Sequence, residues 1–202
     1  MPGHLMRVTS SELATVLMHV IAHWLRSEKM ERLKRDLGVS ADRAPVFEWE
    51  ASFFLIWATQ QAVSTQGFTE RLAREALDQF RDLFRAGLAQ SGCSEAQLRN
   101  IEAFLAVRAE SYSAAIRDPH GGGAAWNLSR RAANYLAGRD VSDGLVIASV
   151  GAIYGEHRKA LREALAQYQL VEVREGDGAG HAHGADPGPT GDQGGEGAGT
   201  GR

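Results

Sequence analysis

The sequence has a single cysteine, Cys93, in a chain of 202 residues. One cysteine excludes a disulfide within the chain and argues against a cysteine-based zinc site, because such sites need several thiolates. No stretch approaches the roughly 18 consecutive apolar residues that a membrane-spanning helix requires. The first residues also lack the apolar segment and cleavage site of a signal peptide. We therefore expect a cytoplasmic protein that does not insert into membranes.

The chain also lacks an excess of positive charge. Its formal net charge is −3, and residues 171–202 hold six acids and two arginines, a net of −4, so residues 1–170 come to about +1. Proteins that bind nucleic acids through the phosphate backbone need a basic surface. The charge distribution therefore argues against a nucleic-acid partner.

Residues 171–202 contain no aromatic residue and eleven of the 23 glycines. So little apolar surface cannot offset the conformational entropy that is lost on folding. We therefore predict two regions in the chain. Residues 1–170 form a helical bundle domain, and residues 171–202 form a disordered, acidic, glycine-rich tail.

Apolar residues recur with helical spacing in the first region, and no run alternates apolar and polar residues as a strand does. Thr9 with Glu12 and Ser94 with Gln97 have the spacing of capping boxes, which mark helix starts. Gly138 is a natural helix end. The expected helices span residues 10–37, 45–64, 69–90, 95–118, 124–137 and 142–170. Six helices joined by short loops predict an all-α fold, an antiparallel helical bundle.

The helix expected over 45–64 is apolar almost all round, which is typical of a helix at the centre of a bundle. Glu50 is a charged exception inside this apolar run. Two other expected helices each carry one titratable residue on an apolar face, Arg108 and His157. Because an unpaired buried charge costs several kcal/mol, we expect Arg108, His157 or both to hold Glu50.

Two interpretations of these polar residues stay open. The favoured one is a buried ion pair that fixes the register of the helices. The alternative is a polar pocket inside the bundle, because ligand sites in bundles are built from the inward side chains of facing helices. Such a pocket would be lined by Glu50, Trp57, Gln61, Arg108, Tyr112 and His157.

His19 and His23 are four residues apart, so they share one face of the first expected helix and could bind one metal ion. Two ligands do not make a site, and the glutamate that follows the first histidine in zinc metalloproteases is missing here. The favoured interpretation is a solvent-exposed face. The alternative is a divalent metal ion with a third ligand from elsewhere in the chain, and the sequence indicates no other cofactor.

Residues 120–123 read His-Gly-Gly-Gly, which also occurs in the oxyanion loop of lipases. The Gly-x-Ser-x-Gly motif of those enzymes is missing from the sequence, so we reject a lipase. The favoured interpretation is a flexible connector. The alternative is an anion site at the start of the next helix, with Arg130 and Arg131 two turns further on.

The sequence contains no strong catalytic motif. The charged second half of the first expected helix is typical of a surface that another protein covers. We therefore expect a non-enzymatic protein-interaction or regulatory module, with a protein partner or a second copy of the chain. The alternative is a helical bundle that binds a metal or a small ligand in a polar core pocket and could act as an enzyme.

Overall fold

The computed structural model describes residues 5–172, which form a bundle of seven α-helices and confirm the expected all-α fold. The elements in chain order are β1 (Met6–Val8), α1 (Ser10–Leu25), α2 (Glu28–Asp36), the 3-10 helix η1 (Ala41–Arg43), α3 (Ala44–Ser64), α4 (Glu70–Gln90), α5 (Glu95–Arg117), α6 (Ala124–Ala137), α7 (Gly144–Leu165) and β2 (Tyr168–Leu170). The tail expected from residue 171 onward lies outside the described residues, apart from Val171 and Glu172.

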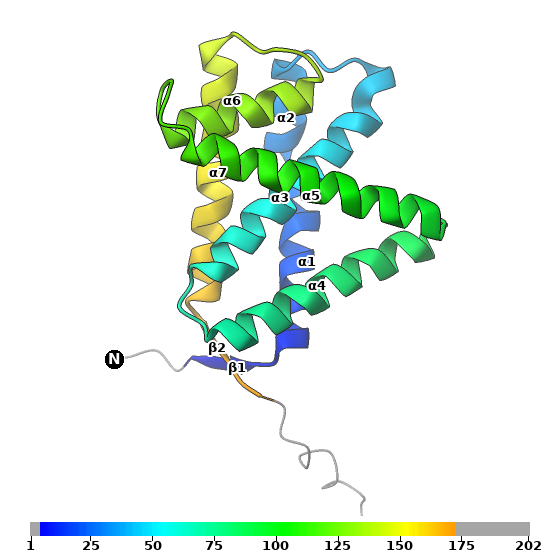
Figure 1. The fold of residues 1–202 in the computed structure, drawn as a ribbon, viewed down its shortest axis with the longest axis vertical. Coiled ribbons are helices and arrows are strands. Elements are labelled where there is room, and N and C mark those ends of the chain that lie inside the picture. Colours follow the sequence, from blue (N-terminus) through cyan, green and yellow to red (C-terminus); the bar gives the residue numbers. More distant parts are fainter. Residues whose placement is uncertain (1–4, 173–202) are drawn as a thin grey trace, which may run out of the picture. The chain divides into compact units, whose positions relative to one another are not determined.

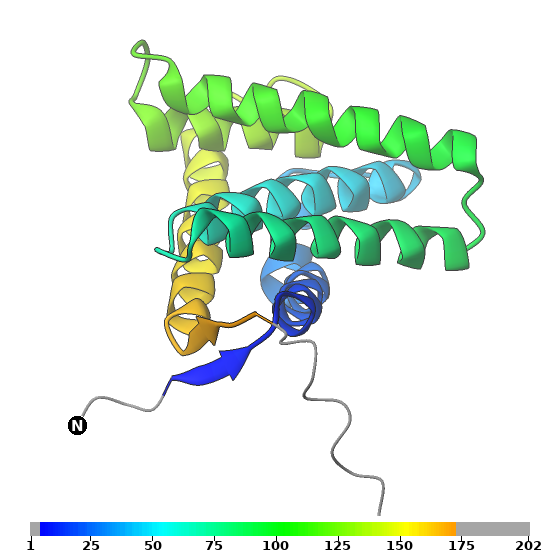
Figure 2. The same cartoon turned by 60° about the horizontal axis from the view of Figure 1, so that its bottom comes forward.

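The helices of this region pack in layers. Figure 2 shows α5 beside α6 in one layer and α3 beside α4 in the next, with α1 beyond them and α7 running across the layers. In Figure 1, α4 and α5 form a hairpin whose arms meet at its tip and separate toward α3. No helix among the described residues is both long enough and apolar enough to cross a membrane.

Helix α3 lies at the centre of the bundle, as its apolar sequence predicts. It packs against α1, α4, α5, α6 and α7, and twelve of its 21 residues are buried. Pro45 stands in its first turn, where the N–H that proline lacks would have no helical partner. A helix enclosed on so many sides has no polar face to give to solvent, which explains its uniform apolar composition.

The structure divides the expected helix over residues 10–37 into α1 and α2. Ser27 causes the break: its hydroxyl donates to the carbonyl of Trp24 at 2.7 Å and accepts from the amide of Met30 at 3.3 Å. A serine that bonds to nearby backbone groups competes with the helical hydrogen bonds and favours a new N-cap. The charged second half of the expected helix is therefore a separate short helix, with Met30 and Leu33 buried.

Strands β1 and β2 pair in parallel, with Met6 opposite Tyr168 and Val8 opposite Leu170. The ladder ties the first described segment to the segment that follows α7 (Figure 1). Each strand has only three residues. A run of that length is too short to show the alternation by which strands are recognised in a sequence.

Candidate functional site

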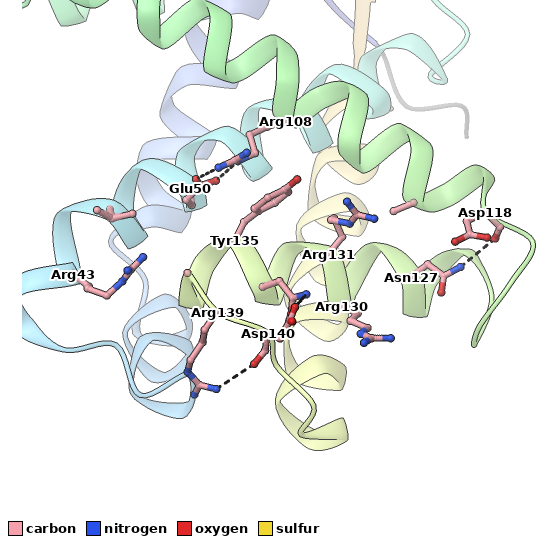
Figure 3. A pocket seen from close by; sticks show the side chains of 14 residues that line it. Arg43, Glu50, Arg108, Asp118, Asn127, Arg130, Arg131, Tyr135, Arg139 and Asp140 are labelled. Carbon is pink, nitrogen blue, oxygen red and sulfur yellow. Dashed lines mark hydrogen bonds and ion pairs between the residues drawn. The ribbon is translucent and has the colours of Figure 1, made fainter.

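A polar cleft of about 800 Å³ opens between the start of α3, the second half of α5, helix α6 and the loop after α6 (Figure 3). Five arginines line it: Arg43, Arg108, Arg130, Arg131 and Arg139. Three carboxylates also line it: Glu50, Asp118 and Asp140. Positive charge therefore exceeds negative charge in the cleft.

Helix α6 supplies more of the lining residues than any other helix, because it has one polar and one apolar face. The polar face carries Asn127, Arg130, Arg131 and Asn134, which line the cleft. The opposite face carries Leu128, Ala132 and Leu136, which are buried in the core. Residues three or four apart lie on the same side of a helix, so this alternation turns the arginine pair toward the cleft.

The C-terminal end of α6 holds Arg43. Gly138 caps the helix in the left-handed conformation, at φ 64°. A Cβ atom at this position would clash with the guanidinium of Arg43, so the glycine leaves the space that Arg43 occupies. The partial negative charge at a helix C-terminus also attracts a guanidinium. Arg43 thus lies against the end of α6, in the space that the glycine leaves.

Arg139 is also held by backbone groups. Its guanidinium donates to the carbonyl of Leu37 at 3.3 Å and to that of Asp140 at 3.4 Å. The Asp140 carboxylate accepts from the side-chain amide of Asn134 at 3.0 Å, and the side-chain Oδ1 of Asn134 accepts from the backbone amide of Val141 at 2.8 Å. These bonds fix the loop between α6 and α7 at one end of the cleft.

Glu50 and Arg108 form a bidentate ion pair on the floor of the cleft. The Nε atom of Arg108 donates to Oε2 of Glu50 at 2.7 Å, and Nη2 donates to Oε1 at 2.5 Å. Glu50 is only 8% exposed. The guanidinium also lies 3.8 Å from the ring centre of Tyr135, and its hydrogen bonds with Glu50 raise the pKa of Arg108. The expected pairing of Glu50 with Arg108 is confirmed.

The pKa of Tyr135 is lowered, against the effect of burial, by the hydrogen bonds and positive charges around its hydroxyl. Its hydroxyl lies 2.7 Å from the hydroxyl of Ser111, which also accepts from Nη1 of Arg131 at 3.2 Å. Burial by itself would raise the pKa of Tyr135. The hydrogen bonds with Ser111 and Arg131 and the charges of Arg108 and Arg131 outweigh burial, so the pKa of Tyr135 falls below its ordinary value.

Trp57 and Tyr112 pack behind the ion pair and do not line the cleft. Their rings are 5.3 Å apart, and Phe54 packs against both. The indole N–H of Trp57 donates to the hydroxyl of Ser113 at 3.3 Å. Tyr112 is fully buried, and burial together with the charge of Glu50 raises the pKa of its hydroxyl. Both residues therefore belong to the apolar core that supports the cleft.

His157 and Gln61 lie away from Glu50. His157 is fully buried on α7, its Nε2 atom 3.3 Å from the hydroxyl of Thr59 and its ring edge-on to Trp24. Burial lowers the pKa of His157 to about 4, so the imidazole is neutral at pH 7. Gln61 is exposed. Of the six residues expected to form one pocket, only Glu50 and Arg108 line the cleft.

His19 and His23 are both exposed on α1. Within residues 5–172 no group of three His, Cys, Asp or Glu side chains is placed to hold a metal ion. The third ligand that the pair needs is therefore missing from this part of the chain.

The sequence points to Glu50, Arg108, Arg130 and Arg131 but carries no signal for the other end of the cleft. Arg43 immediately precedes α3, and Arg139 follows Gly138, the C-cap of α6. Both arginines sit at helix boundaries, where a charged residue is ordinary. Only folding brings the two boundaries together, so no local pattern marks them as a pair.

No known protein family matches this chain, and neither a curated protein nor a solved structure is similar to it. Its class is therefore defined by its own fold and site, as an all-α bundle with an arginine-lined cleft.

Proposed function

We propose that the protein binds a small organic anion in the arginine-lined cleft. The observation that carries the proposal is the convergence of arginines without carboxylate partners. Arg43, Arg130, Arg131 and Arg139 make no ion pair with an acidic residue among residues 5–172, although all four line one cleft. An anionic ligand would supply the missing negative charge.

Guanidinium groups suit this role. Arginine presents a planar set of N–H donors that matches the oxygens of a carboxylate or a phosphate, and it stays protonated in proteins. A group that does not release its proton is a binding group and not an acid or base. The arginines therefore support ligand binding, the alternative of the two functions expected from the sequence.

The cleft has the size of a small-molecule site. Its volume of about 800 Å³ falls in the range of roughly 300–1,000 Å³ in which such ligands bind. Glu50 neutralises Arg108 at the floor, so the ligand meets the four remaining arginines. Because this contact is electrostatic and open to solvent, added salt should weaken it.

Calorimetric titration of the full chain with citrate and with inorganic pyrophosphate tests the proposal. We expect saturable binding that weakens about 10-fold or more in the double variant Arg130→Ala/Arg131→Ala, because each lost charge-assisted hydrogen bond is worth about 1.5–3 kcal/mol. Arg130 and Arg131 are exposed and Arg131 donates a side-chain hydrogen bond to Ser111, so their removal should lower the thermal unfolding temperature by only a few degrees.

Arg99→Ala is the matched control for this experiment. Arg99 is an exposed arginine on the adjacent helix α5 and does not line the cleft. Combined with Arg35→Ala on α2, where Arg35 is also exposed and does not line the cleft, Arg99→Ala removes the same two positive charges from the molecule but should leave anion affinity intact. Equal weakening by both variants would mean that anions respond to net charge and not to the cleft. Absence of binding to either anion would remove the support for the proposal.

A second candidate function is the self-association expected from the sequence. Glu50 pairs with Arg108 and Trp57 with Ser113, so α3 and α5 run in the same direction. One turn earlier on each helix stand Val46 and Phe104, which are 44% and 56% exposed, and Val107 next to Arg108 is 59% exposed. Exposed apolar side chains gathered at one place are typical of protein contacts. This surface supports a contact with a protein partner or a second copy of the chain, and a second copy is the partner that can be tested directly.

A further inference from the structure

The arginines of the cleft form two separate groups. Arg130 and Arg131 lie in the middle of α6, whereas Arg43 and Arg139 lie at its C-terminal end, beside Gly138. Figure 3 shows the two groups on opposite sides of Tyr135. Seven residues separate Arg131 from Gly138, which corresponds to about 10 Å along a helix.

The group at the end of α6 lies against backbone groups. Arg43 lies against the helix C-terminus at Gly138, and Arg139 donates to the carbonyl of Leu37 near the end of α2. Helix C-termini carry partial negative charge, so they hold a guanidinium in place without cancelling its full charge. Both arginines therefore keep positive charge for a ligand.

The space between the two groups has no free positive charge. Arg108 is neutralised there by Glu50, and Tyr135 lies over its guanidinium. The Asp140 carboxylate, held by Asn134, stands between Arg139 and Arg130 in Figure 3. A negative group at this point would be repelled by Asp140, because like charges at close range are unfavourable.

We propose that the cleft binds one ligand with two anionic ends, about 10 Å apart and joined by an uncharged spacer. The ligand class is an α,ω-bisphosphate or α,ω-dicarboxylate. One end contacts Arg130 and Arg131, and the other contacts Arg43 and Arg139. This inference rests on the proposed anion binding and adds the shape of the ligand to it.

Two anionic ends on one molecule explain why both arginine groups occur in one cleft. Once the first end is bound, the second binds as an intramolecular step at a high effective concentration. The gain depends on spacer length, since a short spacer cannot reach the second group and a long one must fold back. A ligand of matched length should therefore bind much more tightly than either end alone.

Calorimetric titration of the full chain with methylphosphonate and with a series of linear alkane-α,ω-bisphosphonates tests this inference. We expect an affinity maximum where the phosphonates are about 10 Å apart, at least 10-fold tighter than methylphosphonate. In Arg43→Gln the maximum should disappear, whereas in Arg99→Gln, at a position that does not line the cleft, it should remain. An affinity that does not vary with spacer length, or a maximum that survives in Arg43→Gln, would overturn the two-ended ligand.

The variant Asp140→Asn tests whether the part of the ligand between its two ends is uncharged. Tripolyphosphate carries negative charge along its whole chain, so Asp140 should weaken its binding, and Asp140→Asn should strengthen it about 10-fold. The same change should strengthen the binding of the best bisphosphonate less, because its uncharged spacer is not repelled by Asp140. Equal effects on both ligands would also overturn the inference. If methylphosphonate binds but the affinity of the bisphosphonates does not vary with spacer length, the proposed anion binding stands and the two-ended ligand does not. If none of these anions binds, neither proposal stands.

Discussion

Glu50 carries a charge in the most apolar helix of the protein, and one guanidinium compensates for it. The two hydrogen bonds from Arg108 use both carboxylate oxygens of Glu50. Removing one member of a buried ion pair leaves the other charge unpaired, which costs more than removing both. The pair therefore constrains which substitutions the cleft floor tolerates.

Unfolding in urea should show this coupling. We expect Glu50→Leu and Arg108→Met each to lower the free energy of unfolding by about 3 kcal/mol. The double variant should recover most of the loss, because neither charge then remains buried without a partner. Single losses that simply add in the double variant would show that the ion pair is not coupled in this way.

The buried imidazole of His157 should make the free energy of unfolding depend on pH. Its pKa is about 4 in the folded protein against 6.5 when unperturbed, so the folded state favours the neutral imidazole. The stabilisation is complete above pH 6.5 and is lost as pH falls toward 4, because only the unfolded chain takes up the proton there. Between pH 7.5 and 4.5 the loss should reach about 2–3 kcal/mol.

Comparison of urea unfolding at the two pH values in the wild type and in His157→Gln measures this loss. The variant has a smaller, always neutral side chain, so its stability is lower but less sensitive to pH over this interval. His19→Gln is the control, since His19 is exposed on α1. If His157→Gln keeps the full pH dependence of the wild type, another group is responsible for it.

At the scale of the elements, α6 decides where the cleft lies. Its apolar face packs into the core and its polar face turns outward, and both faces are readable in the sequence. The Gly138 cap then brings the helix end against Arg43. The glycine was expected as a helix stop, but its contact with a residue of η1 follows only from the way the helices pack.

The division of α1 from α2 depends on one local side chain. The periodicity of residues 10–37 is continuous across the break, so it predicts one helix. Ser27 instead bonds to the backbone on both sides and starts a new helix, whose end then supplies the Leu37 carbonyl to Arg139. A local polar side chain therefore overrides periodicity and shapes one end of the cleft.

At the scale of the whole molecule, the described body leaves an apolar surface beside the cleft. Phe104 and Val107 on α5 are more than half exposed, although both are large apolar residues. A second copy of the chain that covered them would remove this surface from water, which is favourable at about 25 cal/mol per Å² of apolar area. The cleft and the contact surface would then lie side by side on α5.

Size-exclusion chromatography with light scattering tests the self-association. We expect a dimer at micromolar concentration, and we expect Phe104→Ser/Val107→Ser to shift the protein to the monomer. Leu145→Ser is the control, because Leu145 is 82% exposed but lies at the start of α7. A monomeric wild type, or a double variant that remains dimeric, would contradict a contact through this surface.

The sequence by itself determined the helical class, the central place of the helix over 45–64 and the presence of charges on apolar faces. These properties depend on periodicity and composition, which are local. It also limited the partner of Glu50 to Arg108 or His157, because a buried charge needs an opposite charge or a hydrogen bond. Only the tertiary structure shows that Arg108 pairs with Glu50 and that His157 contacts Thr59 instead.

The tertiary structure alone decided where the arginines gather. Arg43 and Arg139 are 96 positions apart in the chain, and each is an ordinary residue at a helix boundary. They meet because the end of α6 packs beside the start of α3, with Gly138 giving Arg43 the space to lie against it. Charge convergence depends on distances in space, and helical spacing carries no information on how separate helices are placed.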